Sequence, residues 1–184
     1  SVIAKEGFYI HQRNQKGASL LHRAAEHGHV GVMELLIKKG LDIHALDRKK
    51  ISILHYAAQK GHVEAVALLL ELGADVHRLD KNASSSLNYA TQNGHIEVMK
   101  VLLEHGVHIV YKREFWRSFA LHDACLNSDP KVAELLLDRG ADVHQLCGKR
   151  KTPLHDAAQK GHLEVVKLLV ARKANLNRLD CNKF

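Results

Sequence analysis

A sequence repeat with a period of 33 residues constrains the fold of this 184-residue chain more than any other feature. Segments 20–30, 53–63 and 86–96 align at that spacing, and segments 120–130 and 153–163 continue the frame after one inserted residue. Each copy combines a polar stretch, a short helix, a turn, and a second helix with apolar residues at helical spacing. Because one such helix pair cannot bury its apolar face alone, we expect neighbouring copies to stack into one all-α solenoid.

The residue types at the ends of the expected helices fit this interpretation. Ser or Thr precedes the first helix of four copies as an N-cap, and Gly follows the second helix of four copies as the usual left-handed C-terminal residue. Pro153 falls at a first helical position, where its missing N–H does no harm. The N-cap positions are Ser19, Ser52, Ser85 and Thr152, and the closing glycines are Gly40, Gly73, Gly106 and Gly140.

The frame is most complete at residues 152–170, TPLHDAAQKGHLEVVKLLV, and this segment resembles the ankyrin repeat. The resemblance covers essentially the whole chain and implies an ankyrin-repeat solenoid of antiparallel helix pairs, stacked side by side, with projecting β-hairpin fingers. We expect one continuous solenoid domain that is a fragment of a longer array, and a natural short protein with degenerate caps is the alternative. Its units are the tail of a truncated upstream repeat at 1–12, five repeats at 13–45, 46–78, 79–112, 113–145 and 146–178, and the start of a sixth finger at 179–184.

The composition indicates an intracellular protein. Apolar residues make up 46% of the chain, but no uninterrupted apolar run is long enough for a membrane span. The three cysteines are scattered and odd in number, which argues against a disulfide framework. We therefore expect a reducing compartment, the cytoplasm or the nucleus. The truncated ends of the array could also self-associate.

Histidine is unusually frequent, with fifteen residues. Equivalent positions of stacked repeats lie about 8–10 Å apart, which is too far for the ligands of one metal ion. The resemblance instead implies that His22, His55, His122 and His155, in the TPLH slot, form hydrogen bonds between neighbouring units. The sequence contains no P-loop, GxGxxG, HExxH or GxSxG motif. We therefore expect no enzyme activity, no metal site and no cofactor.

Positive charge is concentrated in the five fingers, taken as 13–18, 46–51, 79–84, 112–118 and 146–151. They hold twelve basic and three acidic residues, a net charge of +9, whereas the whole chain carries +7 and the remaining residues therefore sum to −2. One interpretation is a solvated loop edge. The one-sided bias favours the other interpretation, an electropositive strip that steers an acidic partner.

The finger tips are candidates for recognition, because the repeat frame uses the structural positions. Phe115 and Trp116 stand beside arginines in the irregular fourth finger, a composition typical of binding hot spots, although Trp116 could instead fill the space left by that loop. We expect Phe119, in the cap slot, to lie in the core. The candidate partner-binding residues of the fingers are Arg48, Lys49, Ile51, Lys81, Arg113, Phe115, Trp116, Arg117, Lys149, Arg150 and Lys151.

The exposed side of the first helices adds a polar and aromatic groove. Tyr56 and Tyr89 offer large contact area at little entropy loss, although they could equally pack together between repeats. The third copy matches the frame least, with Asn88 in place of histidine, and we expect it to be locally the least stable unit. The candidate residues on the first helices are Tyr56, Gln59, Lys60, Tyr89, Gln92, Asn93, Asp123, Asn127, Gln159 and Lys160.

Three functions remain open from the sequence. The resemblance favours a protein-protein interaction module that binds another protein or acidic peptide, with an acidic or mixed-polar surface, on its concave basic side. Basic fingers with aromatic residues could also bind an anion, a nucleotide or RNA. The third hypothesis is a structural spacer in a larger protein.

Overall fold

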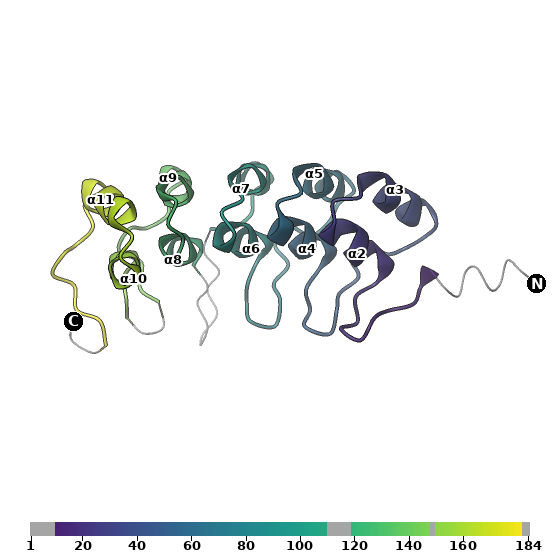
Figure 1. Ribbon diagram of the computed structural model, residues 1–184, viewed down its shortest axis with the longest axis horizontal. Helices are drawn as coiled ribbons and strands as arrows, with labels where there is room; N and C mark the ends of the chain where they lie inside the picture. The colour runs from purple at the N-terminus through teal and green to yellow at the C-terminus, as the bar shows by residue number, and fades with distance from the viewer. Residues whose placement is uncertain (1–9, 110–118, 148–149, 182–184) are drawn as a thin grey trace, which may run out of the picture.

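The computed structural model describes residues 10–109, 119–147 and 150–181. Five antiparallel helix pairs line up along the molecule, with the first helix of each pair in one layer and the second helix in the other (Figure 1). The fingers extend from the layer of first helices (Figure 1). The all-α solenoid predicted from the repeat is confirmed. The pairs are α2 (Leu20–Glu26) with α3 (Val30–Lys38), α4 (Ile53–Lys60) with α5 (Val63–Glu71), α6 (Ser86–Gln92) with α7 (Ile96–Glu104), α8 (Ala120–Cys125) with α9 (Pro130–Asp138), and α10 (Pro153–Lys160) with α11 (Leu163–Ala171).

Each first helix begins where the sequence predicts. Ser52 caps α4: its N–H donates to Nδ1 of His55 at 3.2 Å, and its Oγ lies 2.6 Å from the same nitrogen. Asn88 replaces the histidine in α6, and its Oδ1 accepts from the Ser85 N–H at 3.1 Å. Since an amide oxygen and a neutral imidazole nitrogen are both acceptors, both residue types complete the reciprocal cap.

The second helices end in the left-handed conformation that the glycine frame predicts. The φ angles at Gly40 and Gly73 are +90° and +85°. Lys173 takes the same position after α11 with a φ of +64°. The chain can therefore turn sharply into the next finger after every helix pair.

The first two fingers are tight turns, each closed by one isolated antiparallel bridge, and residues 10–109, 119–147 and 150–181 contain no strand longer than a bridge. The bridges join Arg13 to Ser19 and Leu46 to Ser52, across the base of the first two fingers. The hairpin shape therefore depends on turn hydrogen bonds more than on a strand ladder.

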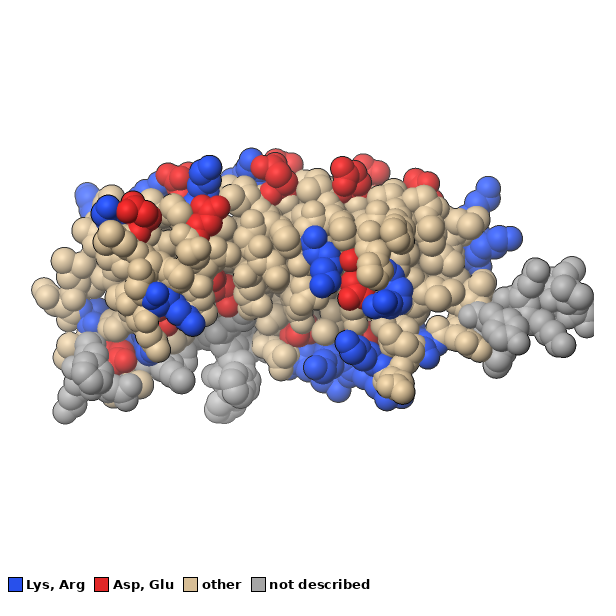
Figure 2. Space-filling view, viewed as in Figure 1, with Lys and Arg blue, Asp and Glu red and all other residues tan. Residues whose placement is uncertain are grey.

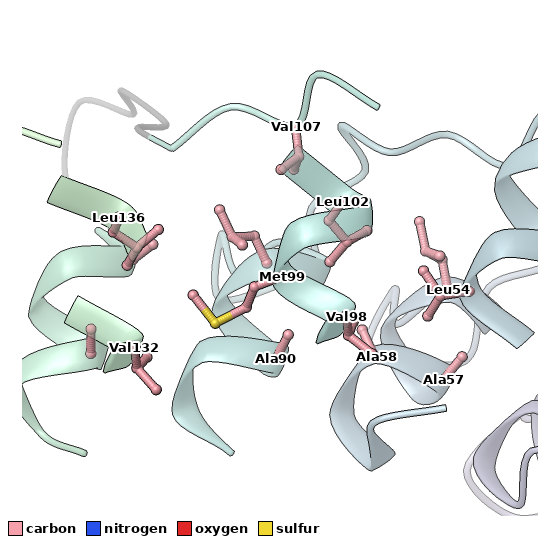
Figure 3. Packing of buried hydrophobic residues seen from close by; sticks show 14 of the residues in the cluster. Leu54, Ala57, Ala58, Ala90, Val98, Met99, Leu102, Val107, Val132 and Leu136 are labelled. Atoms are coloured by element: carbon pink, nitrogen blue, oxygen red, sulfur yellow. The ribbon is translucent and has the colours of Figure 1, made fainter. Parts of the chain in front are cut away.

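One apolar core runs along the stack between the two layers. Leu54 of α4 and Val98, Met99 and Leu102 of α7 are at most 2% exposed, and they lie in the same cluster as Val132 of α9 (Figure 3). Phe119 and Cys125 are also buried, as expected from their slots. This continuous packing holds neighbouring repeats at fixed spacing.

Histidines connect the repeats on the side of the short inter-helix turns. The ring nitrogen Nε2 of His62 lies 3.1 Å from the Glu26 carbonyl oxygen, and Nε2 of His95 lies 3.0 Å from that of Gln59. Gly61 has a φ of +78°, and a Cβ added there would lie 2.6 Å from the His95 ring. The turn therefore needs glycine both for its conformation and for the close approach of the next repeat.

No helix in the described residues has the length and apolar character that a membrane crossing requires. The same residues contain no group of three or more His, Cys, Asp or Glu side chains arranged to hold a metal ion.

Candidate protein-interaction surface

The second finger is organised by a buried carboxylate. Oδ1 of Asp47 accepts hydrogen bonds from the backbone N–H groups of Lys49 and Ile51, at 2.7 and 2.9 Å. Its Oδ2 accepts from the hydroxyl of Tyr56 on α4 at 3.1 Å. The finger is thereby fixed to the first helix of its own repeat, and the only acid of the finger is fully engaged in holding the turn.

The third finger repeats this arrangement. Oδ1 of Asp80 accepts from the N–H groups of Asn82 and Ser84, at 2.8 and 2.9 Å, and Oδ2 accepts from the Tyr89 hydroxyl at 2.9 Å. Asp80 is buried, with 3% of its surface exposed. The tyrosines are thus supports for the fingers, a role that the sequence pattern did not indicate.

The basic side chains at the finger tips remain unneutralised by the chain's own carboxylates. Within the described residues, Arg48, Lys49 and Lys81 are exposed and form no ion pair, and the same holds for Arg150. Lys and Arg gather along the finger edge beneath α2 and α4, whereas Asp and Glu lie interspersed with Lys and Arg along the opposite edge over the second helices (Figure 2). The molecule therefore has a basic edge and an edge of mixed charge.

The first three fingers are joined to one another. The Arg48 N–H donates to the Lys16 carbonyl oxygen at 3.0 Å, and the Lys81 N–H donates to the Lys49 carbonyl oxygen at 3.0 Å. The Arg13 guanidinium donates to the Leu46 carbonyl oxygen at 2.7 Å. These bonds fix the spacing of the tips, so a partner meets a preorganised surface.

Two tip cations occupy strained backbone positions. Lys50 and Arg150 have φ angles of +61° and +56°, the left-handed region that normally favours glycine. In the first finger the same position holds Gly17, with a φ of +80°. A Cβ at Gly17 would lie 2.9 Å from the Arg48 side chain, so glycine is needed there for space as well.

A concave hollow lies between the first two fingers and the first helices of repeats one to three. Its volume is about 510 Å³, and Lys16, Arg48, Lys49, Tyr56 and Tyr89 are among its lining residues. A neighbouring hollow of about 310 Å³ shares Lys16 and Tyr56 with it. The predicted residues Ile51 and Gln59 also line the larger hollow.

The two tyrosine rings in this hollow are held rigidly. The Tyr56 ring packs edge-on against His22, and the Tyr89 ring packs edge-on against His55, each with ring centroids 5.3 Å apart. Burial and the neighbouring Asp47 carboxylate raise the pKa of Tyr56 to about 12, and burial together with the Asp80 hydrogen bond raises the pKa of Tyr89 further. Both hydroxyls therefore stay protonated as donors, and the rings line the groove as fixed apolar walls. The two tyrosines contact histidines of the preceding repeat, and no ring contact joins them to each other in the described structure.

Several candidates on the first helices interact within the protein. Asp123 is partly buried, and its carboxylate accepts from the amides of Asn88 at 2.6 Å and Gln92 at 3.2 Å. Burial raises the pKa of Asp123, although these hydrogen bonds act in the opposite direction. Asn93 donates to the Tyr89 carbonyl oxygen at 2.8 Å. Asp123 thus links the third and fourth repeats.

The remaining candidates lie at the edges of the groove. Lys60 and Lys160 are exposed. The Lys151 ammonium donates to the Gln159 side chain at 2.6 Å, and Asn127 packs against Gly94 while its Oδ1 accepts from the Asp129 N–H at 3.0 Å. Five candidates lie outside the described residues: Arg113, Phe115, Trp116, Arg117 and Lys149.

The structure also brings together residues that the candidate set omitted. Gln15 and Lys16 line the hollow, and Lys50 is an exposed tip cation. An alignment of the finger sequences on their N-caps gives Lys16 and Lys49 equivalent positions. It also gives Lys50 the position of Gly17, whose backbone is left-handed. The packing of one finger against the next, which creates the hollow, has no signal in the sequence of a single repeat.

The helix pairs, the joined fingers and the groove beside the first helices define a repeat solenoid with an open concave face. A family model that describes three consecutive ankyrin repeats matches four overlapping ranges of the chain, 2–80, 21–113, 72–147 and 88–180. The chain therefore belongs to the ankyrin repeat family.

Two relatives with similar sequences align with only a part of this chain. The human ankyrin repeat and KH domain-containing protein 1 is 45% identical over 58 residues, which is 32% of this chain and 2% of that protein. Chicken (Gallus gallus) inversin is 50% identical over 48 residues, which is 26% of this chain and 4% of inversin. The chain thus spans a small fraction of these relatives. The crystal structure of the human ASB11 ankyrin repeat domain superposes with a TM-score of 0.81 at 27% identity, covering 88% of this chain and 72% of that one.

Proposed function

We propose that this chain is a protein-interaction module that binds an acidic or mixed-polar surface of its partner on the concave side formed by the fingers and first helices. Ankyrin repeats generally mediate protein-protein interaction and are generally not enzymes. The observation that carries the more specific proposal is how the charged side chains of the fingers are buried or exposed and paired. The acids Asp47 and Asp80 are buried in their own turns, while the described tip cations Arg48, Lys49, Lys81 and Arg150 are exposed and form no ion pair with another described residue.

This arrangement favours an acidic partner for an electrostatic reason. Exposed cations at fixed spacing produce a positive field that steers an acidic surface during encounter and disfavours a basic one. Because the first three fingers are joined by backbone hydrogen bonds, little backbone entropy is lost on binding. The three cysteines of the described residues are free thiols, which supports a partner in a reducing compartment, the cytoplasm or the nucleus.

The test is an affinity capture from cell lysate with three forms of the full chain. The site variant carries Arg48→Glu, Lys81→Glu and Arg150→Glu, one change on each of three fingers. The control variant carries Lys38→Glu, Lys39→Glu and Lys131→Glu on the second-helix side, with the same change in net charge. We expect a protein partner that is retained by the wild type and the control and lost on the site variant. Equal retention by all three forms would refute the proposed surface.

Binding of a nucleic acid to the basic fingers is the competing function. The salt dependence of binding distinguishes the two functions. Binding of RNA through several phosphate contacts would fall by orders of magnitude between about 50 and 200 mM salt. A protein interface that also buries Tyr56 and Ile51 would weaken far less. Captured partners that disappear after nuclease treatment would assign the fingers to nucleic acid instead.

A further inference from the structure

The hollow between the first and second fingers has an unbalanced charge. Lys16, Arg48 and Lys49 line it, and none of them forms an ion pair with another described residue. Its two acids are already engaged, because Asp47 accepts three hydrogen bonds and Glu26 pairs with Arg23. Three cations against two acids leave the lining with a net positive charge, so the hollow attracts an anion.

Beside these cations the hollow has an apolar wall. Ile51 and Tyr56 are half-buried, and the Tyr56 ring is fixed by its contact with His22 and by its hydrogen bond to Asp47. A ligand here meets positive charge on the finger side and a rigid apolar surface on the helix side. An inorganic anion would use only the first of these features.

The finger backbone offers a ligand few free donors. The N–H groups of Arg48, Lys49 and Lys50 donate to the Lys16 carbonyl oxygen, the Asp47 carboxylate and the Asp47 carbonyl oxygen respectively. A peptide therefore cannot add to the second finger as a β-strand, because strand addition needs unpaired backbone groups. Recognition depends on the long basic side chains and the amide of Gln59, which read side chains of the ligand.

The size of the hollow suits a short segment. Its volume of about 510 Å³ lies in the range of sites that enclose a small ligand, and the adjoining space of about 310 Å³ extends it along the groove. We propose that this hollow is the principal recognition site and that it selects an extended segment of the partner in which a carboxylate side chain lies next to an apolar one. The proposal rests on the proposed function and specifies which part of the concave side reads the partner and by what chemistry.

The experiment selects ligands from random sequences, so it does not require the partner to be identified first. A displayed library of random twelve-residue peptides is enriched on the immobilised full chain, and the most enriched peptide is synthesised with a fluorescein label for anisotropy measurements. We expect Asp or Glu beside an apolar residue in the enriched peptides. Enrichment of peptides without acidic residues, or no enrichment at all, would overturn the proposal.

Matched variants then test the location. The variant Arg48→Glu with Lys49→Glu should bind the labelled peptide at least tenfold more weakly than the wild type. Lys38→Glu with Lys39→Glu, which changes the same charge at the end of α3, should bind it as the wild type does. Equal weakening in both variants would show a general field effect and refute the site. Thermal unfolding of each variant confirms that it is folded.

A second readout reports on the hollow directly. The chain has four tyrosines, so 3-fluorotyrosine gives four ¹⁹F resonances, which Tyr→Phe substitutions assign. The peptide should shift the resonance of Tyr56, and an unchanged Tyr56 resonance at saturation would contradict the proposal. A fluorescein-labelled oligouridine is measured in parallel, and tighter binding of it than of any selected peptide, lost in the site variant, would assign the hollow to nucleic acid.

These results separate the two proposals. If lysate partners depend on the finger cations but no acidic peptide binds in the hollow, the concave side is an interface for a folded surface. In that case the proposed function stands and this inference fails. If neither lysate partners nor peptides depend on the finger cations, both fail.

Discussion

Acid should destabilise this protein in a range set by its buried histidines, and His55 allows the effect to be worked out. Its ring is 1% exposed, Nδ1 accepts from the Ser52 N–H, and Nε2 lies 3.1 Å from the Ser84 carbonyl oxygen. Since Nδ1 is an acceptor, the neutral ring with its proton on Nε2 fits the site. Burial lowers the pKa of His55 to about 4, outweighing the hydrogen bond to Ser84 and the nearby Asp80 carboxylate.

The sign of the pH dependence follows from these pKa values. The unfolded chain binds a proton at His55 near the ordinary pKa of 6.5, whereas the folded chain does so only near 4. Between these values the unfolded state binds more protons, so the free energy of unfolding decreases as the pH falls. The stability contributed by the neutral ring is fully present only well above pH 6.5, and about 2 kcal/mol of it is lost at pH 5.

The third repeat supplies a control for this experiment. Asn88 occupies the slot of His55 and completes the same cap without a titrating ring. We expect His55→Asn to lower the free energy of unfolding at pH 7 by roughly 1 kcal/mol, because the bond to Ser84 is lost. The variant should also lose about 2 kcal/mol less than the wild type between pH 7 and pH 5.

The measurement is urea unfolding followed by circular dichroism at pH 7, 6 and 5 for both proteins. Contributions from other groups, including His22, whose pKa burial also lowers, are common to both proteins and cancel in the comparison. The reasoning is refuted if both proteins lose the same stability between pH 7 and pH 5, or if the wild-type profile is flat.

Three further outcomes follow from the described contacts. Lys50→Gly should raise the free energy of unfolding by about 0.5–1 kcal/mol, since glycine adopts the left-handed conformation freely; unchanged or lower stability in urea would contradict this. Cys125 should react with a thiol reagent only on unfolding, because it is fully buried and burial raises its pKa to about 12, while Cys147 and Cys181 react in the native state; a count of three fast thiols would contradict this. Backbone amides of the third repeat, around Asn88, should exchange with deuterium faster than those of the second repeat, and the reverse order would contradict the expected weakness of that copy.

Most of the fold follows from the period and the residue types at helix ends. Ser52 and Thr152 mark the helix starts because only a few side chains cap an N-terminus, and Gly73 marks a helix end because few residues adopt a positive φ. These effects are local, so they can be predicted from the sequence. Phe119, which takes the cap slot in the fourth copy, was predicted to lie in the core and is buried.

The candidate site is less predictable because it depends on contacts between repeats. Asp123 looks like an exposed helix residue by its slot, but Asn88 of the preceding repeat draws its carboxylate into a hydrogen bond of 2.6 Å. Asp47 looks like an acid at a basic tip, but the turn buries it and Tyr56 completes its hydrogen bonds. In both cases the partner lies several residues or a whole repeat away, and the sequence frame does not record which partner is chosen.

The left-handed positions of the fingers bear on whether the tip charges serve binding or form only a solvated edge. Glycine would satisfy the backbone at Lys50 and Arg150, as Gly17 does in the first finger, and a residue with a side chain costs about 1–2 kcal/mol there. Local stability alone therefore favours glycine, yet the second and fifth fingers carry a cation in this position. The third finger carries Ala83 there, with a φ of +62°, so the same strain also occurs without a charge. Departures from local preference of this kind are expected where a residue serves binding, because the requirement for the side chain then outweighs the strain. If so, Lys50→Gly should stabilise the fold and at the same time weaken the binding of the acidic partner. If the finger edge is purely structural, the substitution should stabilise the fold and leave binding unchanged.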